Sequence, residues 1–396
     1  MAIVYLDNNA TTRTDPEVVT AMLPFFSEHY GNPSSTHMVG EPVSAALRAA
    51  RKSVQAFLGA AAEQEILFTS GGTEANNAAL HWGLAQGGER NELIISAVEH
   101  PAILSVAEAL EKEGRAKVHV IGVDRRGRLD RDAYRRALGP ATALVSIMWA
   151  NNETGTIFPV AQLAEMAHEA GALFHTDAVQ AAGKIAIDLK AVPVDMLSLS
   201  GHKFHGPKGI GVLYLRKGLK FRPLLRGGHQ ERGRRGGTEN VPAIMGLARA
   251  AELASDRLCE EQVRLSALRD QFESAVLANI ADCVVNGDAE NRLFNTSNIA
   301  FDCAEGEVIL IELNRAGFAC SSGSACTSGS TEPSHVLKAM GVSFTAAPGA
   351  IRFSFSRENT EADVIRLVEI LPTIIDKARA ASLFAKRAAS PVVGVG

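Results

Sequence analysis

The chain has 396 residues, of which 46% are hydrophobic and 21% charged, and its formal net charge is −4. This length is enough for about two to three domains, and the mixed charges exclude the basic surface expected of a protein that binds nucleic acid. The sequence has no apolar run of about 18 residues and no basic, then apolar, leader, so we expect a cytoplasmic protein without a membrane span. Five cysteines are too few for a disulfide framework, which favours free thiols.

Apolar runs alternate with helical periodicity from about residue 60 to residue 220, which predicts an α/β fold with a mostly parallel sheet. A first helix is expected to begin at Asp15-Pro16-Glu17, because a capping residue, a proline and an acid suit a first turn. A helical stripe beginning at Val160 is closed by Gly171. Strands are expected at 93–96, 118–123, 143–148, 173–176, 196–200 and 211–215.

A second region follows a long predicted helix at 241–278. It is expected to form a smaller α+β domain, with strands at 297–301 and 351–355 and helices at 307–316 and 360–380. The predicted division is therefore a large domain at 15–255 and a small domain made of 1–14 and 256–396. The tail, 389–396, is expected to be disordered because it is small and apolar without periodicity.

The segment Ser198-Leu199-Ser200-Gly201-His202-Lys203 places a lysine just after an apolar strand, among hydroxyl and imidazole donors. A lysine that attacks an aldehyde must be partly neutral, and a phosphorylated cofactor beside it needs short donors such as Ser200 and His202. A surface lysine after an edge strand is the alternative interpretation of these residues alone.

Two further segments follow predicted strands. In Phe68–Ala75 a strand runs through Gly71-Gly72 into a helix, and the exposed N–H groups of such a turn suit a phosphate, although an ordinary strand-to-helix turn has the same pattern. In Leu173–Gln180 the strand ends at Asp177. A carboxylate there can hold a proton on a pyridine nitrogen, whereas a capping aspartate is the competing explanation.

His100 and Asn152 also come directly after strands. His100 could cover a ring face and move protons, or it could be a structural histidine, and Asn152 could hydrogen-bond a ring substituent. Open α/β sheets bind their ligands at the ends of successive strands, so these positions favour one shared site.

The run from Cys320 to Ser330 contains almost only small polar residues, which predicts an exposed and mobile segment. Its two thiols, Cys320 and Cys326, would then be available for reaction. Their spacing, without a second Cys or His pair, argues against zinc. The other cysteines are expected to be small buried hydrophobes: Cys259, Cys283 and Cys303.

Over essentially its whole length the chain resembles the cysteine desulfurases of the nitrogenase-associated class, which are related to the housekeeping desulfurases of iron–sulfur cluster assembly. The resemblance rests on Tyr5–Thr12, Gly31–Ser35, Thr69–Glu74, His175–Gln180, Ser200–Lys203, Arg234–Thr238 and Ser321–Cys326. It implies pyridoxal-phosphate fold type I, which is aspartate-aminotransferase-like, with a mostly parallel seven-stranded sheet and a smaller α+β domain. It also implies a homodimer.

The resemblance further implies the roles of individual residues around pyridoxal 5'-phosphate. Lys203 would bind the cofactor as a Schiff base and Cys326 would be the nucleophile. The remaining roles concern binding: Gly72, Thr73, Ser200 and His202 for the phosphate, with Thr238 from the other subunit; Asp177 for the pyridine nitrogen; Gln180 for the ring hydroxyl; Asn152 for the ring edge and the substrate; His100 for stacking and proton movement; and Arg352 for the substrate carboxylate.

The implied reaction converts L-cysteine to L-alanine and leaves a persulfide on Cys326, which could also ligate iron during transfer. An iron–sulfur scaffold protein would accept the sulfur. The residues that follow Cys326, Thr327–Pro333, and the short tail favour nitrogenase maturation as the context. A selenocysteine lyase or cysteine-sulfinate desulfinase would use the same cofactor residues, and a non-enzymatic iron–sulfur scaffold would instead use Cys303, Cys320 and Cys326.

Overall fold

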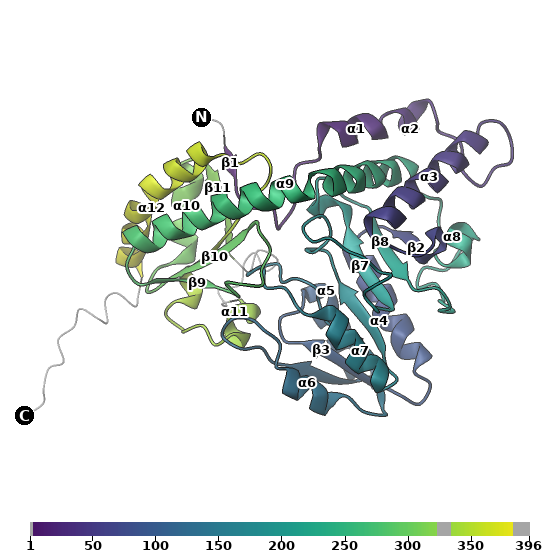
Figure 1. Cartoon of the computed structure of the whole chain (residues 1–396), viewed down its shortest axis with the longest axis horizontal. Coiled ribbons are helices and arrows are strands. Elements are labelled where there is room, and N and C mark those ends of the chain that lie inside the picture. The colour runs from purple at the N-terminus through teal and green to yellow at the C-terminus, as the bar shows by residue number, and fades with distance from the viewer. Residues whose placement is uncertain (1–2, 323–333, 383–396) are drawn as a thin grey trace, which may run out of the picture.

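The computed structural model describes residues 3–322 and 334–382, and a seven-stranded sheet forms its larger part (Figure 1). The strand order is β2-β8-β7-β6-β5-β3-β4, in which β8 runs antiparallel to both neighbours and the other pairs are parallel. The predicted fold class and mostly parallel sheet are confirmed. The strands are β2 (Ile66–Thr69), β3 (Glu92–Ser96), β4 (Lys117–Ile121), β5 (Thr142–Ser146), β6 (Leu173–Asp177), β7 (Met196–Ser200) and β8 (Gly211–Leu215).

The helices of this part begin where the sequence supplies a cap. The Asp15 carboxylate accepts a hydrogen bond from the Glu17 N–H at 2.9 Å and starts α1 (Pro16–Met22), as predicted. The other α-helices here are α2 (Pro24–Ser27), α3 (Glu41–Phe57), α4 (Gly72–Gln86), α5 (Pro101–Lys112), α6 (Arg131–Ala137), α7 (Val160–Glu169) and α8 (Gln230–Gly233). Because helices cover its faces, the interior strands β5, β7 and β8 are buried throughout, including the two serines of β7.

A single long helix, α9 (Val241–Asn279), runs across both parts of the molecule (Figure 1). Its first half packs into the core around the large sheet through residues such as Leu247 and Ala251. Its second half packs into a separate apolar cluster through Leu265 and Phe272. The domain boundary proposed near residue 255 therefore falls inside a continuous helix, and we keep that division as a proposal.

The second cluster lies on a four-stranded antiparallel sheet of order β12-β13-β10-β9. Strands β10 and β13 and helices α10 and α12 agree with those predicted after residue 290, whereas strands β9 and β12 and helix α11 were not predicted. The elements are β9 (Cys283–Asn286), β10 (Thr296–Phe301), β12 (Ser321–Ser322), β13 (Ala350–Ser354), α10 (Gly306–Arg315), α11 (His335–Ala339) and α12 (Glu361–Ala381). Beside it, β1 (Val4–Tyr5) pairs in parallel with β11 (Phe318–Ala319). None of the helices in the described ranges is long and apolar enough to cross a membrane.

Two expectations about cysteines are wrong. Cys259 is exposed on α9 instead of buried. Cys320 is not exposed but packs against the second cluster, because the chain from Cys320 to Ser322 leads into β12 and pairs with β13. The predictions for Cys326 and for the tail at 389–396 fall outside the described residues.

The most deeply buried ion pair joins α3 to α8. Arg51 donates two hydrogen bonds to Glu231, at 2.8 and 2.6 Å, and Glu231 also accepts from the Phe68 N–H. We expect Glu231→Ala to lower the free energy of unfolding by about 3 to 5 kcal/mol, because it leaves the buried Arg51 charge without its partner. Chemical denaturation measures this change. The exposed pair Arg13–Glu358 is the control, and an equal loss in Arg13→Ala would contradict the assignment.

Candidate active site

A cavity of about 350 Å³ lies at the carboxyl ends of the parallel strands, and β13 closes one side of it. Ten of the twelve predicted site residues line this cavity: Gly72, Thr73, His100, Asn152, Asp177, Gln180, Ser200, His202, Lys203 and Arg352. They come from six separate loops or strand ends, so only the folded sheet brings them together. Residues not predicted for the site also line it, among them Asn9, Asn76 and Met148.

The turn between β2 and α4 has the shape needed to bind an anion. Gly71 has a φ of 156°, and a Cβ on Gly72 would lie 2.7 Å from Val179 Cγ2, so both positions require glycine. Helix α4 begins at Gly72, and its first N–H groups have no partners within the helix. Gly72, Thr73, Ser200 and His202 also line an adjoining cavity of about 330 Å³, which widens this end of the site.

Asp177 lies at the end of β6 with only 5% of its surface exposed. Its carboxylate accepts hydrogen bonds from Asn76 Nδ2 at 2.7 Å and from the Val179 N–H at 2.9 Å. These two donors orient the carboxylate inside the cavity. Asn76 lies one helical turn after Gly72, and this spacing was the available signal for it.

His175, two residues before Asp177, has a structural role. It is fully buried between Ser146 Oγ at 2.8 Å and Ser198 Oγ at 2.9 Å, and burial lowers its pKa to about 3. The neutral ring thereby joins β5, β6 and β7. It fixes the relative positions of the strands whose ends carry Asp177 and Ser200.

His100 caps α5 while it faces the cavity. Its Nδ1 accepts the Ala102 N–H at 3.1 Å, so the neutral ring carries its hydrogen on Nε2. Burial lowers the pKa of His100, an effect that the charge of Asp177 opposes and that of Lys203 reinforces. The neutral ring is suited to stacking, and its Nε2–H can be donated to a group in the cavity.

Lys203 ends a short 3-10 turn, Gly201–Lys203, directly after β7. Its Nζ donates to the main-chain oxygens of Asn9 and Ala10, both at 2.7 Å. The neighbouring His202 has its Nδ1 3.1 Å from Thr11 Oγ1, and burial, with Lys203 next, lowers its pKa to about 4. The N-terminal segment thus holds the amine of Lys203 in place.

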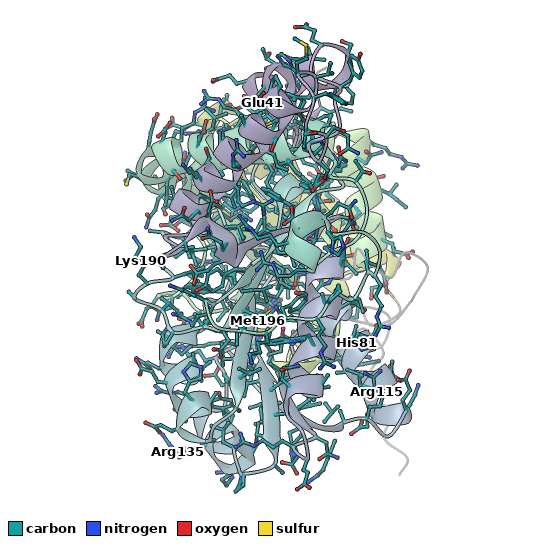
Figure 2. All side chains as sticks on the ribbon, turned by 90° about the vertical axis from the view of Figure 1, so that its right-hand side faces the viewer. Glu41, His81, Arg115, Arg135, Lys190 and Met196 are labelled. Atoms are coloured by element: carbon teal, nitrogen blue, oxygen red, sulfur yellow. The ribbon has the colours of Figure 1, made fainter. Side chains whose placement is uncertain are left out.

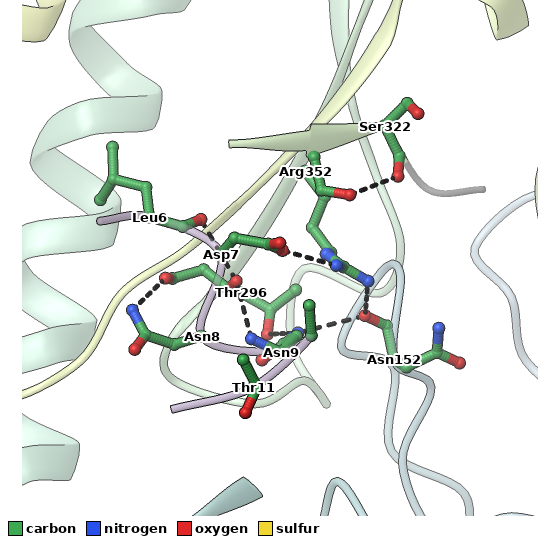
Figure 3. A network of polar contacts seen from close by, with 12 residues as sticks. Leu6, Asp7, Asn8, Asn9, Thr11, Asn152, Thr296, Ser322 and Arg352 are labelled. Carbon is green, nitrogen blue, oxygen red and sulfur yellow. Dashed lines mark hydrogen bonds and ion pairs between the residues drawn. The ribbon is translucent and has the colours of Figure 1, made fainter. Parts of the chain in front are cut away.

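Arg352 on β13 is 2% exposed and is held by two acceptors (Figure 3). Its Nη2 lies 2.8 Å from Asp7 Oδ1, and its Nη1 donates to the Asn152 main-chain oxygen at 3.1 Å. Its buried Nε has no hydrogen-bond partner within the described part of the chain. Arg352 also lines the cavity, where its guanidinium suits a carboxylate ligand.

Thr238 is not among the residues lining this cavity. It lines another cavity, of about 250 Å³, with Thr69, Ser70 and Arg235. Ser70 and Gly209 line both this cavity and the cavity of about 330 Å³ at the start of α4. Cys326 lies outside the described residues, and the described part holds no group of three His, Cys, Asp or Glu side chains that could bind a metal.

The donor set fits a phosphorylated pyridine aldehyde. The site combines a helix N-terminus with Ser200 and His202 for a phosphate, a buried carboxylate at Asp177 for a ring nitrogen, and a lysine amine at Lys203 for an aldehyde. The guanidinium of Arg352, which also lines the cavity, suits a separate carboxylate.

The comparisons with known proteins agree with this arrangement. Residues 4–367 match the family model described as aminotransferase class V. A curated cysteine desulfurase of Gluconacetobacter diazotrophicus is 62% identical over 394 residues, covering 100% of this chain and 98% of that protein. The cysteine desulfurase NifS of Azotobacter vinelandii is 56% identical, covering 96% and 94%. A solved structure of a NifS-like protein superposes with a TM-score of 0.88 at 38% identity, covering 95% of this chain and 100% of the other.

The fold and the matched family model define the chain as a member of the class-V aminotransferase family. Within that class, its identity to full-length relatives shows that it belongs to the cysteine desulfurase family of enzymes.

Proposed function

We propose that the chain binds pyridoxal 5'-phosphate at Lys203 and converts L-cysteine to L-alanine, leaving the sulfur as a persulfide on Cys326. The observation that carries this proposal is the single cavity in which Lys203, Asp177, the α4 N-terminus and Arg352 meet. When bound, the cofactor supplies an electron sink that stabilises negative charge at the substrate Cα.

The residues of the chain would divide the work. Arg352 would bind the substrate carboxylate while Asp7 and Asn152 keep its guanidinium oriented. Asp177 would keep a proton on the ring nitrogen, and Gly72, Thr73, Ser200 and His202 would hold the phosphate. Lys203 Nζ would take the Cα proton, and the neutral His100 would cover the ring and return protons.

Sulfur transfer balances without an external oxidant. The thiolate of Cys326 attacks the substrate sulfur, an S–S bond forms, and the C–S bond breaks. The two electrons of the C–S bond go to carbon, which is protonated, so the product is L-alanine and the oxidised sulfur stays on Cys326.

The described cysteines are poorly suited to this nucleophilic role. Burial raises the pKa of Cys320, with Asp7 adding to the shift, and desolvation also raises the pKa values of Cys283 and Cys303. Raised pKa values reduce the thiolate fraction at neutral pH. Cys259 is exposed on α9, in the apolar clusters of neither sheet.

We propose three further features of the biological context. The enzyme acts as a homodimer in which Thr238 reaches the phosphate of the partner's cofactor, which would explain why it lies outside its own cavity. It works in the cytoplasm. It passes the sulfur to an iron–sulfur scaffold protein for nitrogenase maturation. Cys326 would also ligate iron during this transfer.

Borohydride reduction tests the proposal directly. We expect the purified protein to be yellow, and reduction followed by peptide mapping to place a pyridoxyl group on Lys203, because only an imine at that lysine can be trapped there. The exposed Lys208 is the internal control. A label on Lys208, or no label, would refute the assignment.

Arg352→Lys tests the carboxylate clamp. A lysine cannot keep the contacts to Asp7 and Asn152 and also present a second N–H to the substrate. We expect kcat/KM for L-cysteine to fall about 10- to 100-fold, the scale of one hydrogen bond to a charged group. Steady-state kinetics measures it, with Arg13→Lys as the exposed control. Unchanged kcat/KM in Arg352→Lys would remove Arg352 from substrate binding.

A further inference from the structure

Lys184 is a buried lysine that the proposed reaction leaves without a role. It is 9% exposed, and no ion pair among residues 3–322 and 334–382 includes it. Its Nζ donates to Gln180 Oε1 at 2.7 Å and to Asn9 Oδ1 at 3.2 Å. Burial, followed by the charges of Lys203 and Arg352, lowers its pKa to about 7. Burying an amine beside two other cations is unfavourable, so its position calls for a compensating role.

The contacts of Lys184 determine the directions in which the oxygen and the nitrogen of the Gln180 amide point. Gln180 Nε2 donates to the Asn9 main-chain oxygen at 2.9 Å, and that oxygen can only accept. On the other side of the amide, Lys184 donates to Oε1. A flipped amide would put its oxygen against the Asn9 carbonyl oxygen, which is repulsive, and would give up the hydrogen bond from Lys184 to Oε1.

This orientation decides what Gln180 offers to the cavity that it lines. An amide nitrogen carries two hydrogens, and the contact to Asn9 uses one of them. The second hydrogen can be donated to a ligand. Lys184 is not among the residues lining the cavity, so it acts through Gln180 and does not contact the ligand.

The same amine also orients Asn9. Because Asn9 Oδ1 accepts from Lys184 and from Asn295 Nδ2, its Nδ2 faces the other way and donates to Thr296 Oγ1 at 2.8 Å and the Asn152 main-chain oxygen at 3.1 Å. Figure 3 shows the contacts of Asn9 with Asn152 and Thr296. By donating to both amide oxygens, Lys184 therefore sets which ends of the Gln180 and Asn9 amides act as donors.

We propose that Lys184 is a positioning residue that holds Gln180 as a hydrogen-bond donor to an anionic ring oxygen of the bound cofactor. This inference rests on the proposed function. A donor stabilises the anionic form of that oxygen, so its loss makes the oxygen more basic. The pH midpoint of the cofactor's absorption change should then rise.

The test is a spectrophotometric pH titration of the holoenzyme. We expect Lys184→Met to raise the midpoint by about one pH unit, the scale of one hydrogen bond. The amide introduced by Lys184→Gln can donate a hydrogen bond to Gln180 but can also turn its oxygen toward it, so this variant should raise the midpoint by less. Lys190→Met is the matched control, because Lys190 is an exposed lysine at the surface (Figure 2), and it should titrate like the unsubstituted enzyme.

A double-mutant cycle separates positioning from a direct effect of charge. In a Gln180→Ala background, Lys184→Met should add no further rise, because the group through which it acts is gone. An equal rise in both backgrounds, or no rise in either Lys184 variant, would overturn the inference. If the unsubstituted protein showed no cofactor absorption, the proposed function itself would fail, and that outcome is distinct from both.

Discussion

Lys203→Ala is expected to reduce L-alanine formation from L-cysteine by a factor of at least about 10³. The substitution removes both the amine that would bind the cofactor and the base that would take the Cα proton, and residues acting as a unit lose nearly all activity when one is removed. The main-chain oxygens of Asn9 and Ala10, which accept from Nζ, belong to residues that line the cavity and can accept from water instead, so the fold should persist. Product analysis by chromatography measures the loss.

The control for this variant is Lys52→Ala on the exposed side of α3, which should keep full activity. Added pyridoxal phosphate should still bind the Lys203 variant without a covalent link, because the phosphate contacts are untouched. Retention of more than about one tenth of the activity would be incompatible with a covalent role for Lys203.

Cys326→Ala is expected to abolish release of L-alanine and transfer of sulfur, again by at least about 10³, while L-cysteine still changes the absorption spectrum of the bound cofactor. The two effects should separate because the proposed role of the thiol is in C–S cleavage and not in the ring electronics. The matched control is Cys320→Ala, six residues earlier, whose thiol is buried with a raised pKa and should be dispensable.

Equal losses in both cysteine variants would reopen the choice of nucleophile. A Cys326 variant that kept its activity on selenocysteine or cysteine sulfinate would point to a lyase or desulfinase, because those leaving groups demand less of the thiol. Mass spectrometry of the unsubstituted enzyme after turnover should find one extra sulfur on the Cys326 peptide.

The sequence was sufficient to predict the positions of the site residues that lie at or directly after the ends of strands. Gly72, His100, Asp177 and Lys203 follow apolar runs whose burial in a parallel sheet made their positions predictable. The short strands of the smaller sheet were missed, because β12 has only two residues and its pairing with β13 depends on distant contacts.

The residues behind the site were not predictable for a related reason. Asn9 and Lys184 have no pattern of their own, and their roles come from hydrogen bonds to residues that lie far away or one turn earlier. The expected burial of Cys259 failed because a place on a long helix does not determine which side of α9 faces solvent.

The N-terminal segment has a consequence for folding during synthesis. Asn8 Nδ2 donates to the Ser354 main-chain oxygen at 2.8 Å, and the Asn9 N–H donates to Ser354 Oγ at 2.9 Å, so these contacts span about 346 residues of chain. Asn8 and Asn9, which leave the ribosome long before β13, must therefore wait for that strand before they reach their places. Contacts of such sequence separation form late, since the closure entropy of the intervening chain must first be offset. The polypeptide that holds Lys203 is thus among the last parts to settle, and a nascent chain truncated before residue 354 would carry a folded large sheet without a completed catalytic centre.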